Sequence, residues 1–126
     1  MRAHFILYVR DQAASRDFYA AVLGRAPTLD VPGMTELDLG PGAVLGLMPE
    51  AGITRLLGPG VDPSKLRGPG RAELYLVVED PAGHHARAVA AGALELSPLS
   101  LRDWGHHAAY SLDPDGHVIA FASPAG

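Results

Sequence analysis

Cysteine is absent from this chain of 126 residues, which excludes disulfides, thiolate metal sites and cysteine nucleophiles. Charged residues are few, at 19%, and the formal net charge is −4 with no basic block. This charge pattern argues against binding to a nucleic-acid backbone. No apolar run approaches the roughly 20 residues of a membrane span, and the N-terminal residues lack the apolar core of a signal peptide. We therefore expect a cytoplasmic protein that contacts neither nucleic acid nor membrane.

Glycine and proline are abundant, with 15 and 11 residues, beside a hydrophobic content of 48%. Together they reach roughly twice their average share, which is typical of many short elements joined by turns. The length suits one compact domain and is too short for two cores of ordinary size.

The hydrophobic pattern predicts a strand, a helix and three strands, in an order that occurs twice. In each copy an aspartate N-cap precedes the helix and a glycine follows it. Pro81 also stands at the first helical position of the second copy. The predicted ranges are strand 4–9, helix 12–23 and strands 28–31, 35–39 and 44–48, then strand 72–78, a helix from 81 to before Gly92, and strands 94–96, 107–112 and 118–122.

The two copies keep a nearly constant spacing along the chain. Asp11 corresponds to Asp80, 69 positions later, and Val44 corresponds to Val118, 74 positions later. We interpret them as two βαβββ modules, residues 1–49 and 71–126, joined by a Gly/Pro-rich linker at 50–70. The fold class is therefore α+β.

Two sequence segments resemble the vicinal oxygen chelate superfamily, which includes glyoxalase I, fosfomycin and bleomycin resistance proteins and extradiol dioxygenases. They are Phe18-Tyr19 with Leu23-Gly24, and the closing run from Asp113-Pro114-Asp115-Gly116 to Phe121. The resemblance covers nearly the whole chain. It implies two modules whose curved mixed sheets surround a shared cavity, and it implies a homodimer.

Strand alternation predicts which side chains face that cavity. One helix covers only one face of a four-stranded sheet, so the other face must meet another module or line a cavity. Parity places Tyr8, Met48, Glu73 and Tyr75 on the inner faces, an apolar lining with a few polar groups. Such a lining is typical of small-molecule pockets.

In metal-dependent members of the superfamily, four side chains on four strands hold a divalent cation. The resemblance carries these positions to His4, Gly46, Glu73 and Ala120. His4 and Glu73 have donor atoms, whereas Gly46 and Ala120 have none on their side chains, so no complete metal centre and no cofactor are expected. A divalent cation at His4 and Glu73 needs a third, unidentified ligand.

The remaining histidines leave the third ligand open. His117 has the opposite parity to Ala120, so we expect it to point away from the cavity. His106 or His107 could point inward, and the sequence leaves the choice between them open. His4 and Glu73 could also form a hydrogen-bonded pair, or an acid–base couple on a bound substrate.

Trp104 precedes the seventh strand and is followed by a glycine, which resembles the cavity-rim loop of bleomycin-resistance-like members. There an aromatic side chain can stack on a flat ligand, although a Trp that packs over the end of the sheet fits the same pattern.

Three functions follow from these observations. The first is a protein that binds a small aromatic or apolar ligand without a metal centre, using Tyr8, Met48, Glu73, Tyr75 and Trp104. The second is a metal-dependent lyase, isomerase or dioxygenase-like enzyme with a cation at His4 and Glu73. The third is a scaffold whose segment 50–70 contacts another protein.

Overall fold

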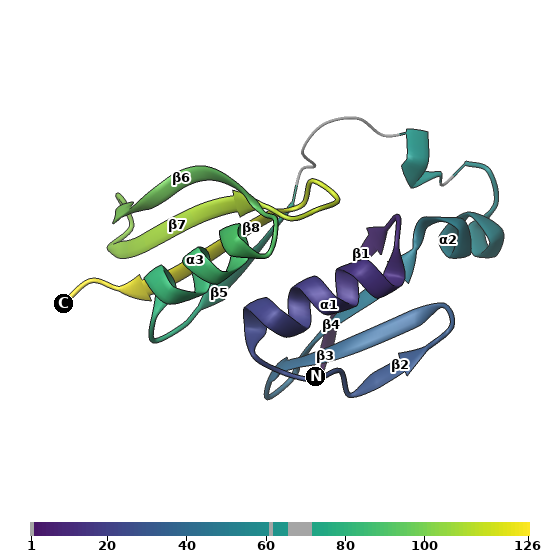
Figure 1. Cartoon of the computed structure of the whole chain (residues 1–126), viewed down its shortest axis with the longest axis horizontal. Helices are drawn as coiled ribbons and strands as arrows, with labels where there is room; N and C mark the ends of the chain where they lie inside the picture. Colours follow the sequence, from purple (N-terminus) through teal and green to yellow (C-terminus); the bar gives the residue numbers. More distant parts are fainter. Residues whose placement is uncertain (1, 61, 66–71) are drawn as a thin grey trace. The chain divides into compact units, whose positions relative to one another are not determined.

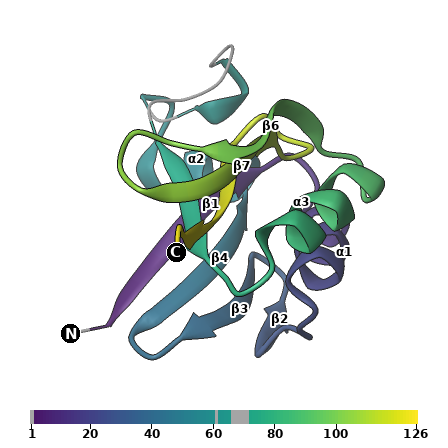
Figure 2. The ribbon, with the colours of Figure 1, turned by 90° about the vertical axis from the view of Figure 1, so that its left-hand side faces the viewer.

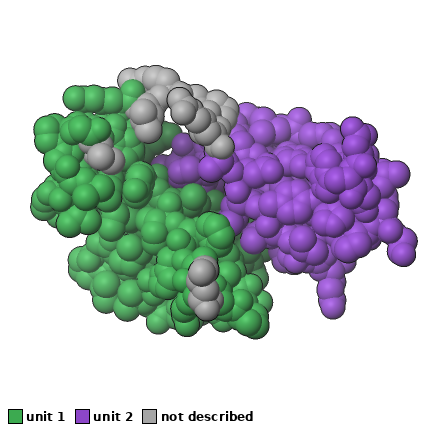
Figure 3. Space-filling model, turned by 180° about the vertical axis from the view of Figure 1, so that it is seen from behind, with its two compact units in different colours: residues 1–67 green, residues 68–126 purple. Residues whose placement is uncertain are grey.

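The computed structural model describes residues 2–60, 62–65 and 72–126. Contacts within the chain divide it into two units, residues 1–67 and 68–126. Figure 3 colours them separately, and each is described here by itself.

The first unit is a mixed four-stranded sheet with a helix across one face (Figure 1). Its strand order is β1-β4-β3-β2, with β1 parallel to β4 and the other neighbours antiparallel. Its elements are β1 (Ala3–Val9), α1 (Gln12–Leu23), β2 (Leu29–Val31), β3 (Met34–Gly40), β4 (Ala43–Pro49), α2 (Glu50–Leu57) and a 3-10 turn, η1 (Pro63–Lys65).

The second unit repeats this plan with the strand order β5-β8-β7-β6. The strands β6 and β7 form one long curved hairpin (Figure 2). The elements are β5 (Glu73–Val77), α3 (Pro81–Ala90), β6 (Leu94–Leu101), β7 (His106–Leu112) and β8 (Val118–Pro124). The element order and the topology predicted for the two βαβββ modules are therefore confirmed. Strand β6 extends five residues beyond the predicted strand.

The helix ends follow the predicted capping chemistry. Asp11 accepts a hydrogen bond from the N–H of Ala14 at 3.0 Å, and Gly24 ends α1 in the left-handed region at φ 65°. Asp80 accepts from the N–H of Gly83 at 3.0 Å, and α3 begins at a proline. Each cap satisfies a helical N–H that has no partner within its helix.

Each sheet packs one face against its helix, and alternation then directs the other residues of each strand to the opposite face. In the second unit the ring of Phe121 lies 5.3 Å from that of His84 on α3, so the odd-numbered residues of β8 face the helix. The fully buried large side chains include Tyr19, Val22, Leu37, Leu45 and Leu47 in the first unit and Ile119 and Phe121 in the second.

Part of the predicted linker is helical. The sequence reading predicted no helix at 50–57, yet α2 forms there and buries Ile53 while Leu56 and Leu57 stay exposed. With one buried side chain in eight residues, this segment lacks the repeated apolar spacing by which a helix is recognised in a sequence. Residues 61 and 66–70 of that linker lie outside the described residues. Within the described part of the chain, no helix is long and apolar enough to cross a membrane.

Candidate functional site

A row of residues crosses the open face of the second sheet. Tyr75 on β5 pairs with Ala120 on β8, and Ala120 pairs with Tyr110 on β7. Residues paired across neighbouring strands point to the same face, and this face is the one opposite Phe121 and α3. The predicted inward orientation of Tyr75 and Glu73 within their own sheet thus agrees with the backbone register. Their role in ligand binding stays a prediction.

Three side chains form a hydrogen-bonded cluster that extends from Tyr75 of this row to the first residue of β7. The indole N–H of Trp104 donates to the Tyr75 hydroxyl oxygen at 2.9 Å. The same oxygen lies 2.7 Å from Nδ1 of His106, and the Tyr75 and His106 rings are stacked with centroids 5.9 Å apart. Trp104 is nevertheless 56% exposed, so much of its indole ring is accessible. Of the two histidines left open by the sequence, His106 is the one that joins the predicted site residues.

Arg102 holds the loop that carries Trp104. Its guanidinium donates to the carbonyl oxygens of Ala108 and Pro98 and to the hydroxyl of Ser97, over distances of 2.8 to 3.1 Å. Its backbone N–H donates to the carbonyl of His106 at 2.8 Å. These bonds join both strands of the β6–β7 hairpin, so the position of the loop is set by a charged, multiply bonded side chain.

Glu73 and Tyr110 add polarity to the same face. Burial is the largest cause that raises the pKa of Tyr110, and the negative charge of Glu73 and the Tyr75 hydroxyl raise it further, against a smaller lowering by Arg102. The guanidinium of Arg102 lies 5.2 Å from the centroid of the Tyr110 ring. Tyr110 is therefore a neutral phenol at ordinary pH. Glu73 is exposed and forms no hydrogen bond or ion pair with the described residues.

The corresponding row of the first sheet is built differently. Ile6 pairs with Gly46, and Gly46 pairs with Glu36. A Cβ atom at Gly46 would lie 2.4 Å from Cδ1 of Ile6 and 3.2 Å from Sδ of Met34, so the space of a side chain is already filled. His4 lies on the same face, with Nδ1 3.3 Å from a carboxylate oxygen of Glu36.

The two other predicted ligand-binding residues of the first unit are neighbours. Tyr8 on β1 pairs with Met48 on β4, one step of alternation beyond the Ile6–Gly46 pair. Both side chains therefore point to the face of Gly46. Their contact with a ligand stays a prediction.

Of the four positions that the resemblance maps, two carry side-chain donor atoms. Gly46 and Ala120 carry no donor, and Ile6 occupies the space beside Gly46. His4 and Glu73 belong to different units, and within its own unit His4 is paired with Glu36 rather than free. Two side-chain donors are fewer than the three protein ligands usual for a catalytic ion of this kind.

One other group of potential metal ligands lies in the β7–β8 turn. Within the described residues, only Asp113, Asp115 and His117 bring three such atoms within 4.8 Å of one another. However, Oδ1 of Asp113 accepts the backbone N–H groups of Asp115 and His117, and Oδ2 lies 2.8 Å from Nδ1 of His117. Both oxygens thus stabilise the hairpin turn, which explains the Asp-Pro-Asp-Gly-His sequence. The ring of His117 is held within the turn by Asp113, and its expected direction away from the cavity stays a prediction.

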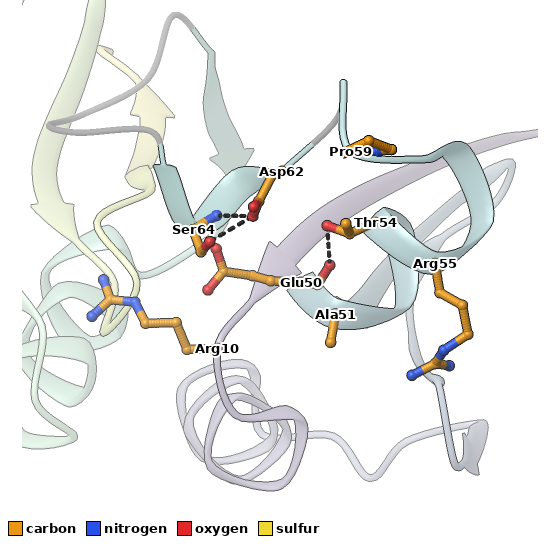
Figure 4. A pocket seen from close by; sticks show the side chains of 8 residues that line it. All are labelled: Arg10, Glu50, Ala51, Thr54, Arg55, Pro59, Asp62 and Ser64. Carbon is orange, nitrogen blue, oxygen red and sulfur yellow. Dashed lines mark hydrogen bonds between the residues drawn. The ribbon is translucent and has the colours of Figure 1, made fainter.

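A hollow of about 630 Å³ lies in the first unit beside α2 and η1 (Figure 4). None of the predicted site residues lines it. Its wall carries charges of both signs. The carboxylate of Asp62 accepts hydrogen bonds from the backbone N–H and the hydroxyl of Ser64. These bonds lower the pKa of Asp62, and the hydroxyl is the larger cause. The lining residues are Arg10, Glu50, Ala51, Thr54, Arg55, Pro59, Asp62 and Ser64.

Comparison with known proteins decides the family. A model described as the Glyoxalase/Bleomycin resistance protein/Dioxygenase superfamily matches residues 2–121. The chain belongs to this superfamily. No protein of curated function matches the chain significantly.

Several solved structures are similar to this chain over almost its whole length. A glyoxalase-related enzyme from Fulvimarina pelagi is 28% identical with a TM-score of 0.83, over 98% of this chain and 87% of that one. A protein from Agrobacterium tumefaciens is 28% identical with a TM-score of 0.76, over 100% and 98%. A family enzyme from Burkholderia phytofirmans, 20% identical with a TM-score of 0.82 over 96% of each chain, shares the fold.

Three residues in or beside these two rows were not predicted from the sequence. Glu36, Arg102 and Tyr110 were not predicted, although the spacing of 74 positions that relates Gly46 to Ala120 also relates Glu36 to Tyr110. That spacing is the feature of the sequence from which Glu36 and Tyr110 could have been predicted. Arg102 shows no sequence pattern of its own, because its role depends on how the hairpin bends.

Proposed function

We propose that this superfamily member binds a small, flat organic ligand without a complete metal centre. The observation that carries the proposal is the Trp104–Tyr75–His106 cluster on the open face of the second sheet. It combines exposed aromatic surface with a few oriented polar groups, the usual composition of a small-molecule site. The resemblance implies that both modules line the ligand cavity, with Tyr8 and Met48 contributing from the first; this stays a prediction.

Fluorescence of Trp104 tests this proposal directly, because it is the only tryptophan of the chain. Titration with flat aromatic compounds such as naphthalene should change its emission with a saturable dependence on concentration. His106→Gln should weaken the response, whereas His107→Gln, next to it on the opposite face of β7, should not. The absence of any saturable response to a panel of flat aromatics contradicts the proposal.

One observation favours a metal-dependent lyase, isomerase or dioxygenase-like activity instead. Glu36 lies in the row of Gly46 and pairs with His4, so its carboxylate is a candidate for the third ligand missing beside His4 and Glu73. Elemental analysis, followed by addition of Ni, Zn, Mn and Fe(II) with melting temperature as readout, tests this. A stabilising shift lost in both His4→Ala and Glu36→Gln would support the metal-dependent enzyme.

The homodimer and the cytoplasmic location also stay predictions. For a second copy of the chain, β6 offers four exposed leucines, and its single charged residue, Glu95, is paired with His85 on α3 at 2.8 Å. Sedimentation equilibrium should therefore show a dimer that Leu96→Lys dissociates. Leu56→Lys, a matched change of an exposed leucine on α2, should leave it intact.

A further inference from the structure

We propose that His106 is a positioning residue whose protonation decides whether the Tyr75 hydroxyl offers its hydrogen to a ligand. This inference rests on the proposed function and adds to it the regulation of the same site by pH. It follows from the two hydrogen bonds at the Tyr75 oxygen and from which partner can donate in each.

The Tyr75 hydroxyl has one hydrogen to donate. The indole N–H of Trp104 can only donate, so the Tyr75 oxygen accepts from it at 2.9 Å. The bond to Nδ1 of His106 has a length of 2.7 Å, which is usual for a hydroxyl donor and lies at the short limit for a neutral N–H donor. With neutral His106, the Tyr75 hydroxyl therefore donates to Nδ1, and its hydrogen is used within the cluster.

Protonation of His106 reverses this bond. An imidazolium carries a hydrogen on both ring nitrogens, so its Nδ1 can only donate. The Tyr75 oxygen then accepts from Trp104 and His106 together, and its own hydrogen must point away from both. An acceptor on a ligand, such as a carbonyl oxygen, meets a donor at Tyr75 that neutral His106 withholds.

The cluster lies where both solvent and a ligand can reach it. Trp104 is exposed, and Tyr75 and His106 are half-buried. Histidine is the side chain whose charge ordinarily changes between pH 5 and 8. A ligand that binds beside the indole ring would therefore meet a cluster whose donors depend on pH.

No ion pair with the described residues fixes the charge of His106. Glu73 is remote, because it pairs with Val118 whereas His106 pairs with Pro124, six positions further along β8. The guanidinium of Arg102 is bonded to the carbonyl of Ala108 instead. The other charged groups on the adjoining segments are Asp103 in the loop, Glu79 after β5 and the C-terminal carboxylate after β8.

A nitrogen-15 NMR titration of the ligand-free protein tests the reversal, because Trp104 is the only tryptophan and gives one indole N–H signal. This signal should move with pH between about 5 and 8, since the indole donates to the oxygen whose other bond reverses. His106→Gln should remove the titration by deleting the titrating group, and Tyr75→Phe by deleting the hydroxyl that transmits it. His107→Gln, the matched change on the opposite face of β7, should preserve it.

Two results of this titration overturn the inference. One is an indole signal of the wild-type protein that does not move with pH. The other is a titration of unchanged size in His106→Gln or in Tyr75→Phe.

Coumarin and naphthalene test the consequence for binding, because both are flat two-ring compounds and only coumarin carries a carbonyl acceptor. Equilibrium dialysis should show coumarin binding about fivefold tighter near pH 5.5 than near pH 8, the effect of about one hydrogen bond, and naphthalene binding equally at both. His106→Gln should abolish the difference for coumarin.

The outcomes separate this inference from the proposed function. Saturable binding of both compounds with the same dependence on pH overturns the inference and keeps the proposed function. If neither compound binds at either pH, the proposed function fails and its regulation fails with it.

Discussion

Adding a side chain at Gly46 tests how tightly the first sheet face is packed. Gly46 has no positive φ angle, so Ala is compatible with its backbone, and replacing a strand glycine should gain about 0.5–1 kcal/mol. Against this, the new Cβ would lie 2.4 Å from Cδ1 of Ile6. Overpacking of this kind costs about 1–3 kcal/mol, and Ile6, at 36% exposure, has room to change rotamer. We expect Gly46→Ala to destabilise the protein by about 1 kcal/mol.

Ile6→Val removes the shorter of the two close contacts, because it deletes the Cδ1 atom and leaves Cγ1 at an ordinary 3.7 Å, while the flexible Met34 side chain, with Sδ at 3.2 Å, can adjust. In this background Gly46→Ala should stabilise the protein by about 0.5 kcal/mol. The double-mutant cycle should therefore show a coupling energy of about 1.5 kcal/mol. Urea unfolding of the four proteins, followed by far-UV circular dichroism, measures it. An equal effect of Gly46→Ala in both backgrounds would refute the steric argument.

Three further predictions concern titration and the hairpin turn. The pKa of Tyr110 is raised in the folded state, so its contribution to stability is present below its unfolded pKa near 10 and is lost as the pH rises through the folded pKa. Absorbance at 295 nm should show a late-ionising component that Tyr110→Phe reduces. The pKa of Asp30 is lowered, first by the hydroxyl of Thr35 and then by Arg16. The ionised carboxylate therefore stabilises the folded state, and this contribution is lost as the pH falls below about 4. In acid titration, the free energy of unfolding of Asp30→Asn should fall less steeply with pH than that of the wild type. Asp113→Ala removes a buried carboxylate that holds two backbone N–H groups and should cost about 3 kcal/mol in urea unfolding, and a loss below about 0.5 kcal/mol would contradict its role in the turn.

The elements were predictable from local chemistry. Asp11, Gly24, Asp80 and Pro81 act within a few residues of their own position, so their patterns can be recognised without a structure. Strand parity likewise placed Glu73 and Tyr75 on the open face correctly. Helix α2 escaped prediction because Ile53 is its only buried side chain, which leaves no apolar period to recognise.

The site was less predictable because it depends on contacts between distant segments. Trp104 and Tyr75 are separated by 29 residues, and no periodicity relates them. The choice between His106 and His107 depends on where β7 begins, and a shift of one residue reverses the face of each side chain. The role of Glu36 becomes visible only when β3 is aligned with β4.

The bonds of Arg102 bear on the selectivity of the proposed ligand site. A loop indole that moved freely would lose conformational freedom whenever a molecule stacked on it, and that loss would weaken every complex. Here the loop is tied to both strands of its hairpin, and the indole N–H is tied to Tyr75, before any molecule arrives. The site of the proposed ligand would then be a rigid template more than an adaptable surface, so compounds of the wrong shape should be rejected rather than accommodated.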